Sequence, residues 1–303
     1  MKLAPVILFT FNRPKHTEQT LKALAANEFS SNTNLYIYSD GPRSKEDFIK
    51  IKEVREVIQA TKTKNIFKSI KVIESKDNKG LANSIISGVS QVFLEYNSVI
   101  VLEDDLVCSN DFLQYMNICL NKYENNNKIA SISGYNPLKK IPDNYKYDAY
   151  FSTRTNSIGW ATWKSNWNNV DWKAKAYNRF KNSFKMRTAF NSTGYDRANR
   201  LDRQINKDAK SWSIIFGFDL FIKNQYTLYP VDSKIIHIGW DGSGTHSSES
   251  QEKFNDTHKV SKYPLLFPAE EILEKDLIKM QRKLFGNSFL MRIKDILIFI
   301  KYF

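Results

Sequence analysis

Apolar runs alternate with amphipathic segments along the first third of the 303-residue chain, and this alternation restricts the possible folds. The apolar runs are rich in β-branched residues and are predicted as strands, whereas the segments between them have helical spacing. This order is typical of a mostly parallel, doubly wound α/β sheet. The predicted strands are 4–11, 34–40, 69–75 and 98–105, and the predicted helices are 15–27, 55–61 and 80–96.

Three consecutive carboxylates, Glu103, Asp104 and Asp105, follow the apolar run at 99–102. Neighbouring carboxylates repel one another and are costly to desolvate, so the cluster indicates either open solvent or a compensating cation. A solvated acidic turn is the commoner explanation of an isolated triplet. Ligands of doubly wound sheets, however, bind beyond the carboxyl ends of the strands, where residues 11–13 and 39–41 place two further polar clusters. This convergence favours a binding site.

The composition limits the partners and the setting of the protein. A formal net charge of +13 implies an anionic partner, which could be nucleic acid, an anionic membrane or a phosphorylated substrate. The aromatic share of 14% fits a carbohydrate site without establishing one. Only two cysteines, Cys108 and Cys119, argue against a disulfide framework and indicate a reducing, cytoplasmic setting. No signal peptide is evident, and no apolar stretch reaches the roughly 18 residues that span a bilayer.

The second half of the chain has a different character. It contains a Trp-rich run, "GWATWKSNW", and a segment at 239–246, "GWDGSGTH", in which glycine alternates with polar residues as in a loop that closes on a ligand. We expect one domain over 1–268, with a nucleotide-binding half at 1–107 and an acceptor-side half at 108–268. Residues 269–303 form a basic amphipathic helical tail, which favours peripheral binding to the anionic inner face of the cell membrane. The alternative is packing on the protein itself or on a second subunit.

Six motifs, taken in order, resemble the glycosyltransferases of the GT-A fold over roughly residues 4–247. They are "FTFNRP", "SDGPR", "NKGLANSI", "LEDDL", "SIGWATW" and "GWDGSGTH". The greatest similarity is to the N-acetylglucosaminyltransferase I type and to bacterial family 2-like sugar transferases of surface polysaccharide synthesis, such as capsule or O-antigen. The resemblance implies metal-dependent transfer of a hexosyl or N-acetylhexosaminyl group, with inversion favoured. The donor would be a nucleotide sugar, UDP-linked, and the acceptor a hydroxyl of a glycan or of a lipid-linked oligosaccharide.

The resemblance also implies roles for individual residues. Asp105 would bind Mn²⁺ or Mg²⁺, hard ions that prefer oxygen ligands and commonly take one or two carboxylates plus substrate phosphates. His246 would be a second metal contact, although a lone loop histidine is more often simply exposed. Asp40 would bind the uracil or ribose edge, with a simple turn former as the alternative. The implied donor-binding residues are Thr10, Phe11, Asn12, Arg13, Asp40, Asn78, Lys79, Glu103 and Asp104.

The sequence differs from the family pattern at the position of the catalytic base. The N-acetylglucosaminyltransferase I type carries a Trp-Asp-Asp step there, whereas the matching stretch here, "KSWSIIFGFDLF", has Trp212 followed by Ser213. The candidates are Asp241 in the closing loop, preferred because that loop can reach the donor, and then Asp208 and Asp219. Trp160, which follows a glycine, is the candidate for stacking on the acceptor sugar.

Two other functions fit parts of the sequence. A sugar-phosphate nucleotidyltransferase would share the sheet but would carry an early Gly-rich phosphate loop, and "FTFNRPKH" contains no glycine. A nucleic-acid-binding module would present basic and aromatic residues at its site, whereas the strand ends here carry carboxylates that repel phosphate. We therefore expect no nucleic-acid partner.

Overall fold

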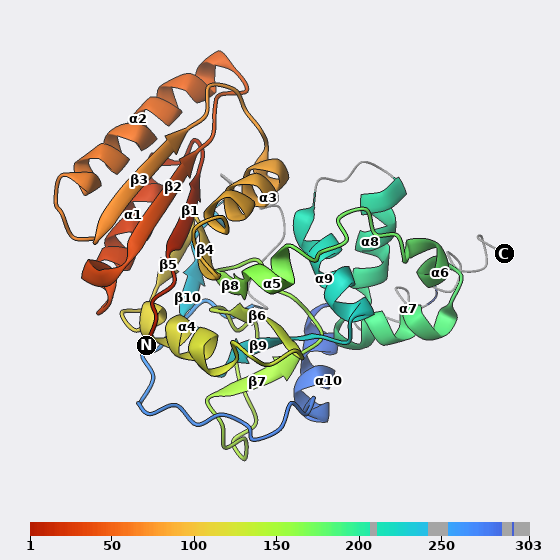
Figure 1. The fold of residues 1–303 in the computed structure, drawn as a ribbon. Coiled ribbons are helices and arrows are strands. Elements are labelled where there is room, and N and C mark those ends of the chain that lie inside the picture. Colours follow the sequence, from red (N-terminus) through yellow and green to blue (C-terminus); the bar gives the residue numbers. More distant parts are fainter. Residues whose placement is uncertain (207–210, 242–253, 287–292, 294–303) are drawn as a thin grey trace.

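The computed structural model describes residues 1–206, 211–241, 254–286 and 293, and it contains one sheet of eight strands within these ranges (Figure 1). The strand order is β3-β2-β1-β4-β8-β6-β9-β7, and only β8 and β7 run opposite to the other six. The bounds are β1 Val6–Thr10, β2 Asn34–Ser39, β3 Ser69–Glu74, β4 Ser98–Glu103, β6 Ile129–Ser133, β7 Ala149–Ser152, β8 Trp160–Trp163 and β9 Tyr226–Pro230. The mostly parallel α/β sheet expected from the sequence is confirmed.

The helices that follow the first three strands cover both faces of the sheet (Figure 1). They are α1 Pro14–Ala25, α2 Lys45–Lys62 and α3 Leu81–Val92. Val6 and Leu8 share a core with residues of α1 and α2, whereas Ile7 and Phe9 share one with α3. This alternation has the period of two expected of a strand buried on both faces. By the same alternation, Glu103 follows Val99 and Val101 on the α3 face of the sheet.

The predicted helix at 55–61 was too short. The helix α2 begins ten residues earlier, at Lys45, where the hydroxyl of Ser44 accepts a hydrogen bond from the Asp47 N–H. This is an N-cap, which satisfies one of the otherwise unpaired N–H groups of the first turn. The charged first turn of α2 lacks the apolar spacing that marked the rest of the helix.

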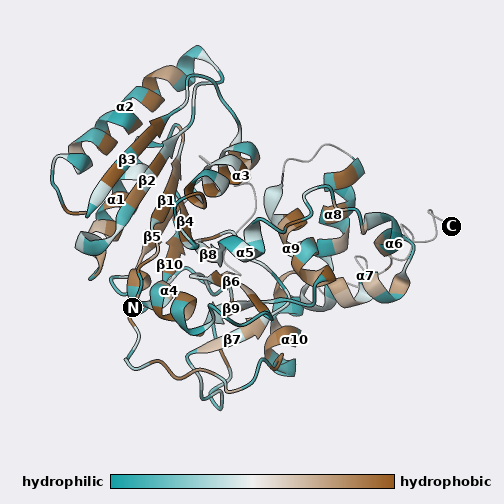
Figure 2. Ribbon diagram, in the orientation of Figure 1, coloured by the Kyte–Doolittle hydropathy of each residue, from teal (hydrophilic) through white to brown (hydrophobic). Residues whose placement is uncertain are grey.

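Apolar residues concentrate on the strands and along α9, whereas α1 and α2 mix polar and apolar residues (Figure 2). Helix α9 is buried nearly all round and packs Trp212 and Phe216 against the α3 side of the sheet. Helices α5 to α8, which precede α9 in the chain, form a cluster beside the sheet (Figure 1). The bounds of these helices and of α9 are α5 Lys164–Trp167, α6 Tyr177–Lys181, α7 Phe184–Phe190, α8 Asp196–Asn206 and α9 Trp212–Ile222.

A second, two-stranded sheet pairs segments that lie far apart in the sequence. Strand β5, Leu106–Cys108, runs antiparallel to β10, Ile235–His237, and places His237 opposite Leu106. The Ile238 N–H donates to the carbonyl of Asp105 at 2.9 Å, which extends the pairing beyond the strand. The chain after β10 is therefore fixed beside the acidic triplet.

A buried ion pair holds β10 in place. Lys234 Nζ lies 2.9 Å from Asp111 Oδ2, just before α4 (Phe112–Lys122), and both side chains are 1% exposed. The ammonium also donates to the carbonyl of Lys259 and to the hydroxyl of Ser261. Burial acts to raise the pKa of Asp111, but hydrogen bonds, including those from Ser109, from the Ser261 N–H and from Lys234, bring it below its usual value. The pair is thus fully satisfied.

The described part of the tail packs on the protein, which is the alternative to membrane binding. In α10, Lys275–Leu284, Leu277 is buried against Tyr150 and Tyr229, and the side chain of Gln281 accepts a hydrogen bond from Ser152 at 2.6 Å. Within the described ranges no helix is both long and apolar enough to cross a bilayer. Membrane binding stays a prediction for the end of the tail, nearly all of which (287–292 and 294–303) lies outside the described residues.

Replacing Lys234 by methionine should destabilise the protein by about 3–5 kcal/mol, because it leaves the Asp111 carboxylate buried without its cation. Chemical unfolding monitored by circular dichroism measures the change. Lys140→Met is the matched control, since Lys140 pairs with Asp143 on the exposed surface at 3.2 Å and should contribute less than about 1 kcal/mol. Equal stabilities of the two variants would contradict this role for Lys234.

Candidate functional site

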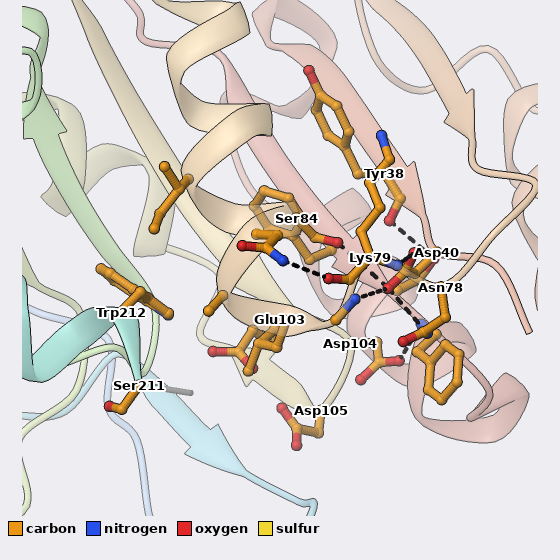
Figure 3. Close-up of a pocket in the computed structure, with 18 of the residues that line it drawn as sticks. Tyr38, Asp40, Asn78, Lys79, Ser84, Glu103, Asp104, Asp105, Ser211 and Trp212 are labelled. Atoms are coloured by element: carbon orange, nitrogen blue, oxygen red, sulfur yellow. Dashed lines mark hydrogen bonds between the residues drawn. The ribbon is translucent and has the colours of Figure 1, made fainter. Parts of the chain in front are cut away.

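A cleft of about 980 Å³ opens at the carboxyl ends of β1, β2 and β4 (Figure 3). Every predicted donor-binding residue lines it, as does Asp105, which confirms that the strand-end clusters converge. The rest of the lining comes from the second half of the chain, chiefly Trp172, Gln204, Ser211, Trp212, Ile215, His237, Gly239 and Trp240. The cleft therefore joins the two halves of the sequence.

The acidic triplet is held by the segment that follows β1. The Phe11 N–H donates to Asp104 Oδ2 at 3.1 Å, and Arg13 donates to the other oxygen of Asp104. A second guanidinium nitrogen of Arg13 lies 2.9 Å from Asp105 Oδ2. Asp104 and Asp105 are buried, whereas Glu103 is partly exposed and lies toward Trp212 in the cleft (Figure 3).

The positive charge near the acidic triplet does not balance its three carboxylates. Burial, together with repulsion from Asp105 and Asp104, raises the pKa of Glu103 to about 8. Burial also raises the pKa of Asp104 to about 6, although Arg13 opposes the shift. A carboxyl group whose pKa rises on folding makes the folded state less stable as the pH increases beyond its unfolded pKa. A cation bound at this edge would relieve that penalty.

Asp40 fixes a loop rather than offering free oxygens to a ligand. Its carboxylate accepts hydrogen bonds from the backbone N–H groups of Gly41, Lys79 and Gly80 and from the side chains of Asn78 and Ser84, at 2.9–3.4 Å (Figure 3). These contacts fill the acceptor positions of a carboxylate. Asp40 thus positions the loop that carries Lys79 into the cleft, and its donor-binding role stays a prediction.

His237 is a site residue that the sequence did not identify. Its Nε2 lies 3.5 Å from Asp105 Oδ2, because the pairing of β10 with β5 brings the two together. Burial lowers the pKa of His237, Asp105 opposes the shift and the nearby Arg13 adds to it, which favours the neutral imidazole. Its Nδ1 has no hydrogen-bond partner within the described part of the chain. A neutral imidazole beside a carboxylate can bind a divalent metal.

Gly239 lets the chain pass directly against this pair. A Cβ atom at this position would lie 2.2 Å from Asp105 Oδ2 and 2.9 Å from Nη1 of Arg13. Any side chain would displace one of them. Gly239, the first glycine of "GWDGSGTH", therefore allows the backbone to approach the Asp105 carboxylate closely.

Two predictions are corrected by the structure. Trp160 is 1% exposed and packs against Trp167 and Trp212, with ring centroids 5.5 and 4.8 Å away, so it belongs to the core instead of the acceptor wall. Asp219 is buried, pairs with Lys223 at 2.6 Å and lies outside the cleft lining. The aromatic residues that do line the cleft on this side are Trp172, Trp212 and Trp240.

The GNT-I family model matches residues 1–185, which is more than half of the chain. The chain belongs to the GNT-I family. This membership confirms the resemblance stated from the motifs, since the GNT-I family is a family of glycosyltransferases with a GT-A-like fold. No curated protein matches the sequence.

Two solved structures show weaker similarity to this GNT-I family member. S. aureus TarS aligns with a TM-score of 0.39 and 12% identity, over 56% of this chain and 30% of TarS. A cytidylyltransferase from Leptospira borgpetersenii serovar Hardjo-bovis aligns with a TM-score of 0.35 and 12% identity, over 56% of this chain and 64% of the other. The chain thus covers less than two thirds of either structure. TM-scores this low carry no argument about function.

The Trp-Asp-Asp carboxylate of the GNT-I type has no counterpart on α9. Ser211 and Trp212 occupy that edge of the cleft instead. Asp241 follows the cleft residue Trp240, is half exposed, and its Oδ2 lies 3.3 Å from His16 Nε2 on α1. Asp208 and His246, predicted as a base and a metal ligand, lie outside the described residues.

Asp40→Ala should release the loop that carries Lys79 while leaving the sheet intact. We expect the amides of Lys79 and Gly80 to exchange hydrogen about tenfold faster, because each loses a hydrogen bond to a charged acceptor. Hydrogen exchange followed by mass spectrometry measures this, with β1 as the internal reference and Asp143→Ala, an exposed aspartate, as the control. Unchanged exchange in the loop would mean that Asp40 does not hold it.

Proposed function

We propose that the protein transfers a sugar from a UDP-linked donor to a hydroxyl of a bacterial surface glycan or lipid-linked oligosaccharide, with Mn²⁺ or Mg²⁺ bound at Asp105. The observation that carries this proposal is the convergence of Arg13, the acidic triplet and His237 in one cleft that tryptophans also line. Cations for a diphosphate, ligands for a metal and aromatic rings suited to a sugar thus share one cleft, and the Trp240 ring lies 4.8 Å from that of His237.

The nucleotide would lie along the strand ends of the first half. The Arg43 guanidinium is 4.6 Å from the centre of the Phe11 ring and pairs with Asp47 at 2.9 Å, so this wall of the cleft is already ordered. A planar base can stack in such a setting, while Arg13 and Lys79 bind the diphosphate. Asn12 and Asn78 border the base and ribose, and Thr10 lies at the floor.

The residues present fit a divalent ion. Asp105 Oδ2 and His237 Nε2 are separated by 3.5 Å, a spacing that suits neighbouring positions around one ion. The described residues hold no cluster of three or more His, Cys, Asp or Glu side chains arranged for a metal. The protein would therefore supply two ligands and leave the others to the diphosphate and water, which is common for Mg²⁺ and Mn²⁺. Such an ion neutralises the charge of a leaving nucleoside diphosphate.

The acceptor would enter from the tryptophan side. Trp172 and Trp240 are partly exposed and offer flat apolar faces on which sugar rings can stack, whereas Trp212 is 5% exposed. Glu103 lies between this wall and Asp104, where it can hold hydroxyls of the transferred sugar. Asp241 is our proposed base: it removes the proton of the acceptor hydroxyl, and His16 orients its carboxylate. An enzymic base of this kind would favour inversion of the anomeric centre.

Asp105→Asn should abolish Mn²⁺-dependent binding of UDP, and His237→Ala should weaken it about 10- to 100-fold, a loss similar to that caused by removing other conserved metal-site partners. Isothermal titration of UDP with and without MnCl₂ measures both. His258→Ala is the matched control, because His258 lies outside this cleft. Wild-type affinity in a folded Asp105→Asn protein would refute the metal site.

Asp241→Asn should lower turnover by roughly 10²- to 10⁴-fold, the usual contribution of a general base, with little change in donor affinity. The substitution keeps the size of the side chain but removes its proton-accepting charge. Steady-state kinetics with a UDP-sugar and a short glycan acceptor measures turnover, and UDP titration measures the affinity. Lost donor affinity with preserved turnover would make Asp241 a binding residue instead of the base.

A further inference from the structure

Arg13 neutralises the acidic edge that a metal ion would otherwise neutralise. Its guanidinium donates to Asp104 through one nitrogen and lies 2.9 Å from Asp105 through another. The carboxylate side chains are 4% and 9% exposed, and that of Arg13 is 18% exposed. The protein thus provides an internal counter-ion at its own proposed metal site.

The guanidinium and a metal ion would compete for the same atom. Arg13 contacts Asp105 through Oδ2, the oxygen that also faces His237 Nε2 at 3.5 Å. The backbone of Gly239 also approaches this oxygen closely, since a Cβ atom at position 239 would lie 2.2 Å from it. Two cations in contact with one carboxylate oxygen would also repel each other. An ion bound at Asp105 therefore requires the Arg13 side chain to move.

The backbone of Arg13 is fixed, so only its side chain can move when an ion binds Asp105. The Arg13 carbonyl accepts hydrogen bonds from both the N–H and the hydroxyl of Thr17, at 3.0 and 2.9 Å, which fixes the backbone at the start of α1. The guanidinium lines the cleft in which a donor diphosphate would lie. Guanidinium groups bind phosphate oxygens through two parallel hydrogen bonds, so the diphosphate is a suitable new partner.

We propose that Arg13 is an exchangeable counter-ion that couples metal binding to donor binding. It occupies Asp104 and Asp105 in the ligand-free protein, and it transfers to the diphosphate when the ion binds Asp105. Because either ligand favours the same displaced position of Arg13, each raises the affinity for the other by the same factor. The displacement also frees Asp104 to accept hydroxyls of the donor. This inference rests on the proposed function, since it requires both ligands in one cleft.

The test compares Mn²⁺ affinity with and without saturating UDP, by isothermal titration and by the electron paramagnetic resonance signal of free Mn²⁺. In the wild type, UDP should tighten Mn²⁺ binding about tenfold or more. In Arg13→Met, Mn²⁺ alone should bind at least about threefold more tightly than to the wild type, because the competing cation is gone. The effect of UDP on Mn²⁺ binding should shrink to the part that comes from direct coordination of the ion by the diphosphate.

Two further variants sharpen the comparison. Lys15→Met removes the same charge from an exposed position two residues away and should behave as the wild type. Arg13→Lys keeps the charge but cannot pair with both carboxylates at once, so its Mn²⁺ affinity without UDP should fall between those of the wild type and Arg13→Met. Circular dichroism establishes that each variant is folded.

Weaker or unchanged binding of Mn²⁺ alone to Arg13→Met, with coupling to UDP as strong as in the wild type, would overturn the role of Arg13 and leave the proposed function intact. A wild-type protein that binds neither UDP nor Mn²⁺ would overturn both.

Discussion

The repulsion among Glu103, Asp104 and Asp105 is the constraint on which the rest of the site depends. Three adjacent carboxylates at the end of β4 repel one another, and the burial of Asp104 and Asp105 adds the cost of desolvating their charges. Arg13 compensates part of this charge from the end of β1, and the backbone N–H of Phe11 contributes a further hydrogen bond. The remaining deficit makes the edge a place for an added cation. The parallel pairing of β1 with β4 sets this arrangement, since it brings both strand ends to one rim.

The parts of the site that follow from local sequence could be predicted. Strands of consecutive apolar residues are readily predicted from the sequence. Because the carboxyl ends of parallel strands meet at one edge of the sheet, Arg13, Lys79 and Asp105 were expected to lie together. Asp40 lies in the cleft as expected, but its hold on the Lys79 loop was not foreseen. Sequence shows that a carboxylate follows a strand, but not that five neighbouring groups already donate to it.

The parts that depend on long-range pairing could not be predicted. His237 reaches Asp105 only because β10 pairs with β5, across more than one hundred residues of intervening chain, and no local pattern signals that register. Trp160 was chosen because a glycine precedes it, yet its side chain faces the core from β8. Trp212 and Trp240 line the cleft because α9 and the segment after β10 close it from the other side. A tryptophan's neighbours along the chain do not reveal which way its ring points.

The family model matches the chain only up to residue 185, so some residues that line the cleft lie within the matched region and others lie beyond it. The donor wall and the acidic triplet lie within the match, whereas Trp212, His237 and Asp241 come from beyond it. The donor chemistry is therefore the better supported part of the proposed function.

The most direct measurement is the thermal unfolding of the wild-type protein with UDP, with Mn²⁺, and with both. Ligands that bind the folded state raise its unfolding temperature, so we expect UDP and Mn²⁺ together to stabilise the protein by more than the sum of their separate effects. No stabilisation by UDP, with or without the metal, would contradict a nucleotide-sugar site at this edge of the sheet.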